Sequence, residues 1–141
     1  MKIAVGVLTH NVYRYRRLYL LTWTLESLFH TPDVEVILMD NNSTDGTQDL
    51  VRKLGGISNP SPNSTTGSGK SELIRYLDAY NPDLYVLSDD DIFWRAGWQD
   101  QIKRFWEAAP DDMALCGVAL EKVYDWNKIT DRDWETYRSG L

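Results

Sequence analysis

The chain has 141 residues, of which 43% are hydrophobic, and this suits one globular domain with a sizeable core. Its formal net charge of −6 argues against a nucleic-acid binder, because such proteins need a basic surface to neutralise phosphates. The single cysteine, Cys116, lies in an apolar run, so neither a disulfide framework nor a zinc site is predicted. No signal peptide and no apolar run of transmembrane length is found, and we therefore expect a cytoplasmic protein.

Short apolar runs alternate with amphipathic segments along the chain. The apolar runs predict strands over residues 2–9, 34–40, 83–91 and 113–123. Helical spacing predicts helices over residues 15–30, 70–81 and 98–109, and a short helix that ends at Gly55 and Gly56. Residues 57–68 are rich in Pro, Ser and Asn, so we expect a loop there with a short strand at its start.

This order of elements predicts the fold class. Because strands alternate with helices, we expect an α/β fold with a Rossmann-like, doubly wound and mostly parallel sheet. Ligands of such sheets bind beyond the carboxyl ends of the strands. We expect one compact domain, with a core over residues 1–123 and a tail over residues 124–141 that serves as an acceptor-side or lid segment.

Polar residues stand at three of these strand ends. The first strand ends in THN (9–11), the second in DNNSTDG (40–46) and a later one in DDD (89–91). Turn formation and helix capping explain the second group equally well, since Asn, Asp and Ser favour such positions. The three adjacent aspartates repel one another, and a divalent cation such as Mg²⁺ or Mn²⁺ would remove that cost and bridge to substrate phosphates.

The runs VGVLTHN, VEVILMDNNSTDGT and LYVLSDDDIFWRAGW together resemble the nucleotide-sugar-binding half of family-2 glycosyltransferases, which have the GT-A fold. The resemblance implies a metal-dependent enzyme that moves a sugar from a nucleotide-diphosphate donor to the hydroxyl of a glycan, lipid or protein acceptor. It also implies UDP as the nucleotide and inversion at the sugar carbon. A bound metal would stabilise the charge of the departing diphosphate.

The resemblance assigns roles to the residues at the first two strand ends. Thr9 and Asn11 would line the nucleotide pocket, and Asp40 would accept a hydrogen bond from the base. Asn42 and Asp45 would flank the base and the ribose.

The Asp-x-Asp element of the family corresponds to Asp89 and Asp91. Asp91 would bind the metal directly, and Asp89 would contact the ribose or a metal-bound water. Asp90 stands between them and is expected to belong to the same donor site. The nearby run YRYRRLY (13–19) holds three arginines, which are predicted mainly to form a solvated face, with one in reach of a diphosphate.

Residues 65–73, TTGSGKSEL, look like the end of a phosphate-binding P-loop. That motif needs a glycine where this chain has Ser64, and it needs a strand directly before it. A phosphotransferase that uses Lys70 is therefore a third-ranked alternative. We expect Lys70 either to donate to a donor phosphate at the start of a helix or to belong to an ordinary capped helix.

An inverting transferase also needs a general base for the acceptor hydroxyl. The tail segment TDRDWETYRSG (130–140) is similar to the family's base-bearing element, although Arg132 replaces the usual acidic partner. The resemblance thus implies Asp133 as the base, with Asp131 as second choice. The alternative is that Thr130 or Asp131 caps a short helix whose carboxylates are solvated. Family members usually carry more acceptor-binding chain, so a nucleotide-sugar-binding module without transferase activity is the main alternative function.

Overall fold

The computed structural model describes residues 1–62 and 65–110, and the chain divides into two units, Met1–Trp94 and Arg95–Leu141. The predicted strand over 113–123, the tail over 124–141, Asp131 and Asp133 lie outside the described residues. The first unit contains β1 (Ile3–Thr9), α1 (Leu18–Phe29), β2 (Val34–Asp40), α2 (Thr47–Lys53), β3 (Ile57–Ser58), α3 (Thr66–Asp78) and β4 (Leu84–Asp89). The described part of the second unit contains α4 (Trp98–Glu107), which begins after Gly97.

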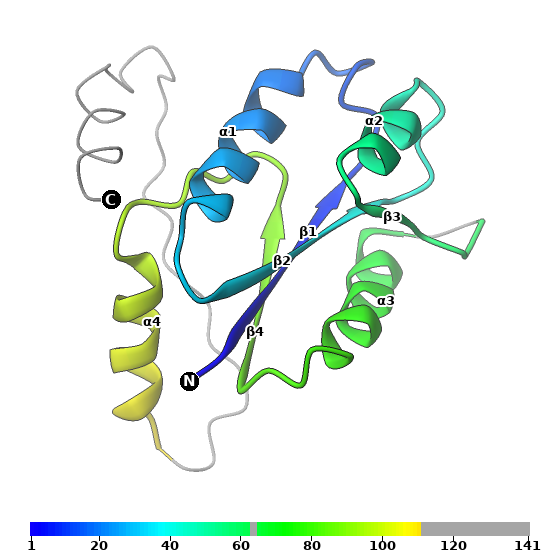
Figure 1. The fold of residues 1–141 in the computed structure, drawn as a ribbon. Coiled ribbons are helices and arrows are strands. Elements are labelled where there is room, and N and C mark those ends of the chain that lie inside the picture. Colours follow the sequence, from blue (N-terminus) through cyan, green and yellow to red (C-terminus); the bar gives the residue numbers. More distant parts are fainter. Residues whose placement is uncertain (63–64, 111–141) are drawn as a thin grey trace. The chain divides into compact units, whose positions relative to one another are not determined.

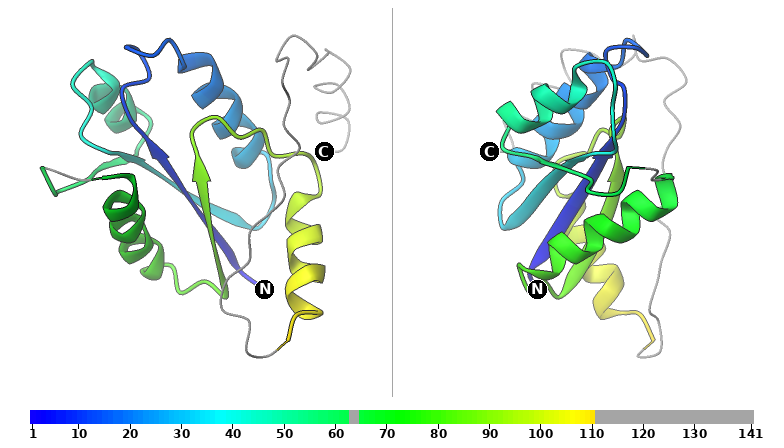
Figure 2. Two further views of the ribbon diagram at one scale, coloured as in Figure 1. Left: turned by 180° about the vertical axis from the view of Figure 1, so that it is seen from behind. Right: turned by 90° about the vertical axis from the view of Figure 1, so that its right-hand side faces the viewer.

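The first unit is a four-stranded sheet with helices on both faces (Figure 1). The strand order is β3-β2-β1-β4, and every pair is parallel. Helices α1 and α2 cover one face and α3 covers the other, as the side view in Figure 2 shows. The predicted α/β fold with a parallel sheet is therefore confirmed.

The central strand β1 is buried along its whole length, as its uninterrupted apolar run predicts for a strand covered on both faces. On the α3 face, Ala4 and Leu8 pack with Leu73 and Leu77 of that helix. Gly6 lies between them, and a Cβ at Gly6 would stand 2.6 Å from the Leu73 side chain. The glycine thus lets α3 approach the sheet closely.

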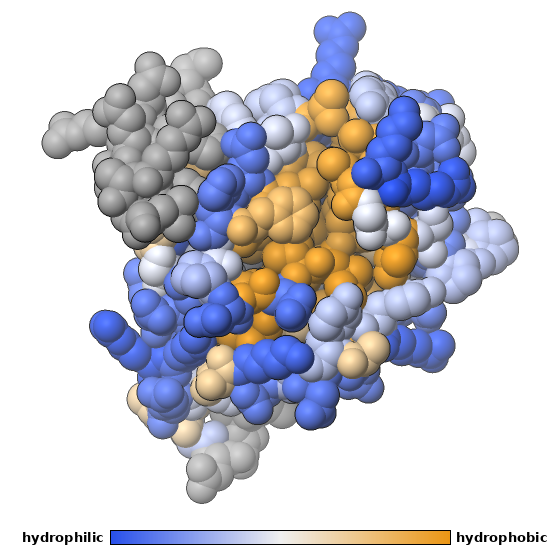
Figure 3. All heavy atoms as spheres, in the orientation of Figure 1, coloured by the Kyte–Doolittle hydropathy of each residue, from blue (hydrophilic) through white to orange (hydrophobic). Residues whose placement is uncertain are grey.

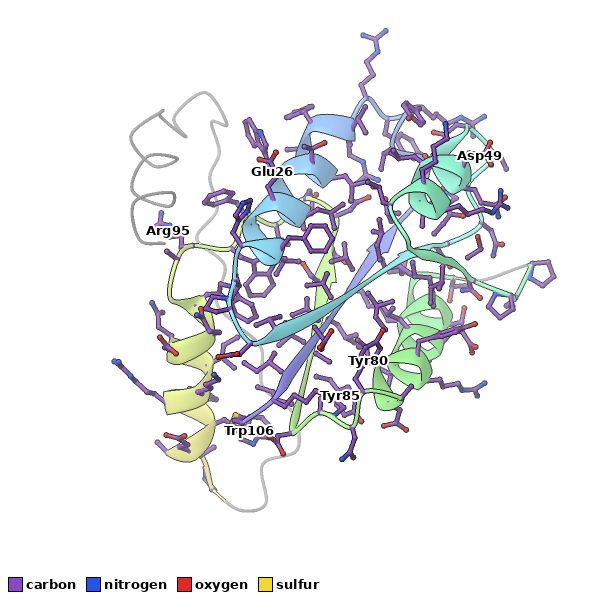
Figure 4. All side chains as sticks on the ribbon, viewed as in Figure 1. Glu26, Asp49, Tyr80, Tyr85, Arg95 and Trp106 are labelled. Atoms are coloured by element: carbon purple, nitrogen blue, oxygen red, sulfur yellow. The ribbon has the colours of Figure 1, made fainter. Side chains whose placement is uncertain are left out.

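Helix α3 begins four residues earlier than the sequence predicts. Thr65 caps it, because its hydroxyl accepts from the Ser68 N–H at 3.2 Å while the Ser68 hydroxyl accepts from the Thr65 N–H at 2.8 Å. At its other end, Tyr85 of β4 donates a hydrogen bond to Asp78 (Figure 4). The Gly-Ser-Gly-Lys-Ser run is therefore the first part of a helix and not a loop.

Helix α1 begins at Leu18, three residues later than predicted. The preceding turn contains Arg16 with a φ of 55°, a left-handed conformation that a helix does not tolerate. A hydrogen bond from the Arg17 N–H to the Val12 carbonyl closes this turn at 2.8 Å.

Among the described helices, none is both long and apolar enough to cross a membrane.

Candidate functional site

The polar strand ends predicted from the sequence meet at one edge of the sheet. In the strand register, Thr9 of β1 lies beside Asp40 of β2, and Leu8 lies beside Asp89 of β4. Each of the three strands ends at or just after these residues. The carboxyl edge of the sheet therefore brings together Thr9, Asp40 and the Asp89–Asp91 segment.

Asp40 carries a buried oxygen atom that lacks a hydrogen bond. Its side chain is inaccessible to solvent, and Oδ2 accepts from the Ser43 N–H at 3.0 Å. Oδ1 has no partner among the described residues. Such an atom is costly to bury, and most buried polar atoms have a partner. This geometry leaves one acceptor position that a donor from outside the described residues would satisfy.

Asn11 ties the end of β1 to the loop after β2. Its Oδ1 accepts from the Thr44 N–H at 2.8 Å, and its own N–H donates to the Ser43 hydroxyl at 2.8 Å. Its Nδ2 lies 2.8 Å from His10 Nε2. Since all these groups have partners and Asn11 is buried, the side chain holds the two loops together.

His10 belongs to this network, although no pattern in the sequence predicts a role for it. Because Asn11 Oδ1 faces an N–H donor, Asn11 Nδ2 must donate to His10 Nε2. The other ring nitrogen, Nδ1, lies 2.9 Å from the Asn41 carbonyl, which only accepts. These contacts suit a ring that donates from Nδ1 and accepts at Nε2. The only sequence signal was its position between Thr9 and Asn11.

Asp45 and Asn42 also hold the loop after β2. Asp45 accepts from the Thr47 hydroxyl at 2.6 Å and from the Arg14 N–H at 2.6 Å. Partial burial acts to raise the pKa of Asp45, but the hydrogen bonds from Thr47 and Arg14 together lower it below its usual value. Asn42 adopts a φ of 59° and donates to the Ser61 carbonyl. Both side chains thus have clear structural partners.

The three aspartates after β4 differ in their surroundings. Asp89 is exposed, and its Oδ1 lies 2.8 Å from Lys70 Nζ. Asp90 is 3% exposed, accepts from the Thr9 hydroxyl at 2.6 Å and lies 3.2 Å from Arg17 Nη1. Burial raises the pKa of Asp90, although the Thr9 hydrogen bond and the Arg17 charge oppose that shift. Asp91 is half-buried.

Asp89 and Asp91 are suitable ligands for a hard cation only if other oxygens complete its shell. Within residues 1–62 and 65–110 no group of three or more His, Cys, Asp or Glu side chains is arranged to hold a metal ion. Mg²⁺ often takes only one or two carboxylates, together with substrate phosphates and waters. The Lys70 ammonium pairs with Asp89, so a metal ion at this carboxylate would share it with Lys70 or replace that contact. The residues therefore fit a metal that binds together with a phosphate ligand.

The glycines of the Gly-Ser-Gly-Lys-Ser run both lie in α3, whereas a P-loop needs them in the loop that precedes a helix. Gly69 is needed for packing. A Cβ there would stand 2.7 Å from Asn41 Oδ1, which accepts from Asn59 Nδ2 at 2.9 Å. Around Gly67 the nearest atom to an added Cβ is 3.9 Å away.

Alanine substitutions should separate these two glycines. We expect Gly69→Ala to lower the free energy of unfolding by about 1–3 kcal/mol, because the added methyl group overpacks against Asn41. Gly67→Ala, the matched control, should leave it unchanged or raise it by up to about 1 kcal/mol through better helix propensity. Urea unfolding followed by circular dichroism measures both. Equal effects of the two changes would contradict the packing role of Gly69.

A shallow apolar hollow of about 470 Å³ lies apart from these carboxylates, on α1 and the loop before it. Tyr13, Tyr19, Trp23 and Arg16 contribute to its lining, which contains no carboxylate. Figure 3 shows an apolar area on the face of the unit that carries α1 and α2. The hollow thus differs from the sheet edge, where carboxylates gather.

Comparisons with known proteins give one family and solved structures of similar fold. Residues 5–139 match the model of a family described as glycosyl transferase family 2. Two crystal structures of S. aureus TarS, one of them of its residues 1–349, resemble the chain with a TM-score of 0.55 and 20% identity over 76% of this chain. The alignment covers 32% and 20% of those chains, so this chain spans about a third and a fifth of their lengths. At this identity the likeness concerns the fold. No curated protein matches the chain.

Proposed function

The chain belongs to glycosyl transferase family 2, and we propose that it is a metal-dependent glycosyltransferase that uses a nucleoside-diphosphate sugar, with UDP as the nucleotide. The family and the GT-A type of fold predicted from the sequence are thereby confirmed. The observation that carries the proposal is the sheet edge, where an unsatisfied acceptor on Asp40 and the Asp89–Asp91 carboxylates flank the end of β1. This matches a ligand with a hydrogen-bond donor at one end and a diphosphate at the other.

Asp40 would recognise the base. The imide N3–H of uracil is a donor, and it would satisfy the unpaired Asp40 Oδ1. Cytosine presents an acceptor at the same position, so an unpaired carboxylate oxygen selects against it. Because Oδ1 is buried, side chains of the neighbouring loops must shift when the base enters. Thr9, Asn11, Asn42 and Asp45 would support this pocket, with Asn11 and Asp45 acting mainly through the loop contacts described above.

The diphosphate would lie over the end of β4. Asp89 and Asp91 would hold the divalent cation, Mn²⁺ or Mg²⁺, which supplies stabilisation of the negative charge on the leaving diphosphate. Lys70 already lies beside Asp89, and it would donate to a phosphate oxygen when the donor is bound. The positive charges of the cation and of Lys70 would therefore let an acidic chain bind an anionic donor at this edge.

The acceptor side involves residues outside the described part of the chain. Asp133 would remove the proton from the acceptor hydroxyl, with Asp131 as second choice, and the reaction would invert the sugar carbon. The acceptor would be a glycan, a lipid or a protein bearing that hydroxyl.

Calorimetric titration of the full chain with UDP tests the proposal directly. We expect UDP to bind in the presence of Mn²⁺. Its affinity should fall at least about tenfold when EDTA removes the metal, because only the contacts between the protein and the nucleotide then remain. CDP and ATP serve as comparators and should bind more weakly. ATP binding that is tighter than UDP binding and insensitive to EDTA would contradict the proposal. Donor binding without donor hydrolysis or sugar transfer would favour a binding module.

A further inference from the structure

Asp90, the middle carboxylate of the three, faces the interior while its neighbours do not. It is 3% exposed, whereas Asp89 is exposed and Asp91 is half-buried. The Asp90 carboxylate lies 2.6 Å from the Thr9 hydroxyl and 3.2 Å from Arg17 Nη1. Asp89 ends β4, and Asp90 and Asp91 form the turn that follows it, so the contacts that hold Asp90 also fix the backbone from which its two neighbours project.

Arg17 is the only described residue that forms an ion pair with Asp90. It directly precedes α1, and its Nη2 donates to the His10 carbonyl at 3.1 Å. Its guanidinium lies 5.4 Å from the centre of the Tyr15 ring. These contacts place one guanidinium between the end of β1, the start of α1 and the end of β4.

We propose that Arg17 is a positioning residue of the donor site, which acts through Asp90 to direct Asp89 and Asp91 outward toward the diphosphate. This inference rests on the proposed function. Without Arg17, Asp90 would be a buried carboxylate with no compensating charge. The segment would then relax by turning Asp90 toward water, and the two flanking carboxylates would lose their common orientation.

A direct contact between Arg17 and the diphosphate is the competing explanation. Two of its nitrogens already bind Asp90 and His10, and its buried Nε has no partner among the described residues. The protein therefore holds Nη1 and Nη2, and only Nε is left for a direct contact with a phosphate oxygen. Arg16, next to it, is exposed and has no ion pair among the described residues, so it serves as a matched control.

A double-mutant cycle on the full chain separates the two explanations. The affinity for Mn²⁺–UDP is measured by calorimetry for the wild type, Arg17→Met, Asp90→Asn and the double variant. We expect Arg17→Met to weaken binding by about 10–100-fold, as losses behind metal ligands typically do. In the Asp90→Asn background the same change should cost less than about threefold, because no buried charge is left to compensate. Arg17→Lys should restore part of the affinity, and Arg16→Met should have no effect.

Each outcome decides the role. An equal loss in both backgrounds would show direct contact with the donor and overturn the proposal, as would the absence of any loss in Arg17→Met. If Arg17→Met weakens UDP binding in EDTA as much as in Mn²⁺, its effect does not depend on the metal, and the positioning role is overturned. Should Arg17→Met not fold, Arg17→Lys against wild type and the double variant against Asp90→Asn complete the test. A wild type that binds no Mn²⁺–UDP would instead overturn the proposed function.

Discussion

Replacing Asp91 with Asn is expected to weaken the binding of UDP in Mn²⁺ by at least about tenfold, close to the loss caused by EDTA, and to reduce sugar transfer with it. Asp91 follows β4 on the donor side of the sheet edge, and an amide in its place keeps the size of the side chain while removing the charge. Its half-buried carboxylate makes no ion pair with the described residues. The free energy of unfolding should therefore change little. Calorimetry with Mn²⁺–UDP and urea unfolding of the same sample check the two parts.

Two further variants, Asp49→Asn and Asp89→Asn, serve as controls for Asp91→Asn. Asp49→Asn removes a carboxylate that pairs with Arg52 in α2 at 2.7 Å and should not alter UDP binding (Figure 4). Asp89→Asn removes the carboxylate that pairs with Lys70, so it frees a lysine as well as a ligand. Its effect in Mn²⁺ should be smaller than that of Asp91→Asn. If Asp91→Asn keeps full metal dependence while Asp89→Asn loses it, the direct ligand is Asp89.

The sheet and the position of the site were predictable from local patterns. The second strand was predicted at its observed bounds, Val34–Asp40, because its apolar run is sharply limited by a proline-containing turn and a polar loop. Parallel strands place their carboxyl ends together, so the convergence of Thr9, Asp40 and Asp89 follows from topology. These features depend on short stretches of sequence and on one general rule.

The different surroundings of the three aspartates were not predictable in the same way. Asp89, Asp90 and Asp91 are identical residues, and only the partners provided by Thr9, Arg17 and Lys70 distinguish them. Thr9 and Asp90 are 81 positions apart in the chain. The arginines of residues 13–19 are predicted mainly to form a solvated face, and no local pattern indicates that the turn before α1 directs Arg17 to the end of β4.

The start of α3 was also not predictable from the usual sequence signals. Gly, Ser and Lys in succession favour a loop by composition, and the usual capping-box signal places Glu or Gln three residues after the cap. In this chain Ser68 takes that place and completes the reciprocal pair with Thr65. Because Ser68 replaces the usual Glu or Gln of the capping box, the helix begins at Thr66, before Lys70. The result places Lys70 on a rigid element beside Asp89.

Replacing Asp40 with Asn is expected to change which base the chain prefers. The Ser43 N–H at 3.0 Å needs an acceptor, so the amide oxygen should take the place of Oδ2 and the NH₂ group the place of the unpaired Oδ1. That NH₂ group would meet the N3–H of uracil as a second donor, and UDP affinity should fall by about 10–100-fold. Cytosine offers an acceptor at N3, so CDP affinity should fall much less or rise.

The ratio of UDP to CDP affinity is therefore the informative measurement, and calorimetry in Mn²⁺ provides it for the wild type and for Asp40→Asn. Folding should survive, because replacing an unpaired buried carboxylate oxygen removes a desolvation cost instead of adding one. Thermal unfolding by circular dichroism checks that part. If both nucleotides lose affinity by the same factor, Asp40 supports the loop after β2 without reading the base. A reversed preference would assign base recognition to this one carboxylate oxygen.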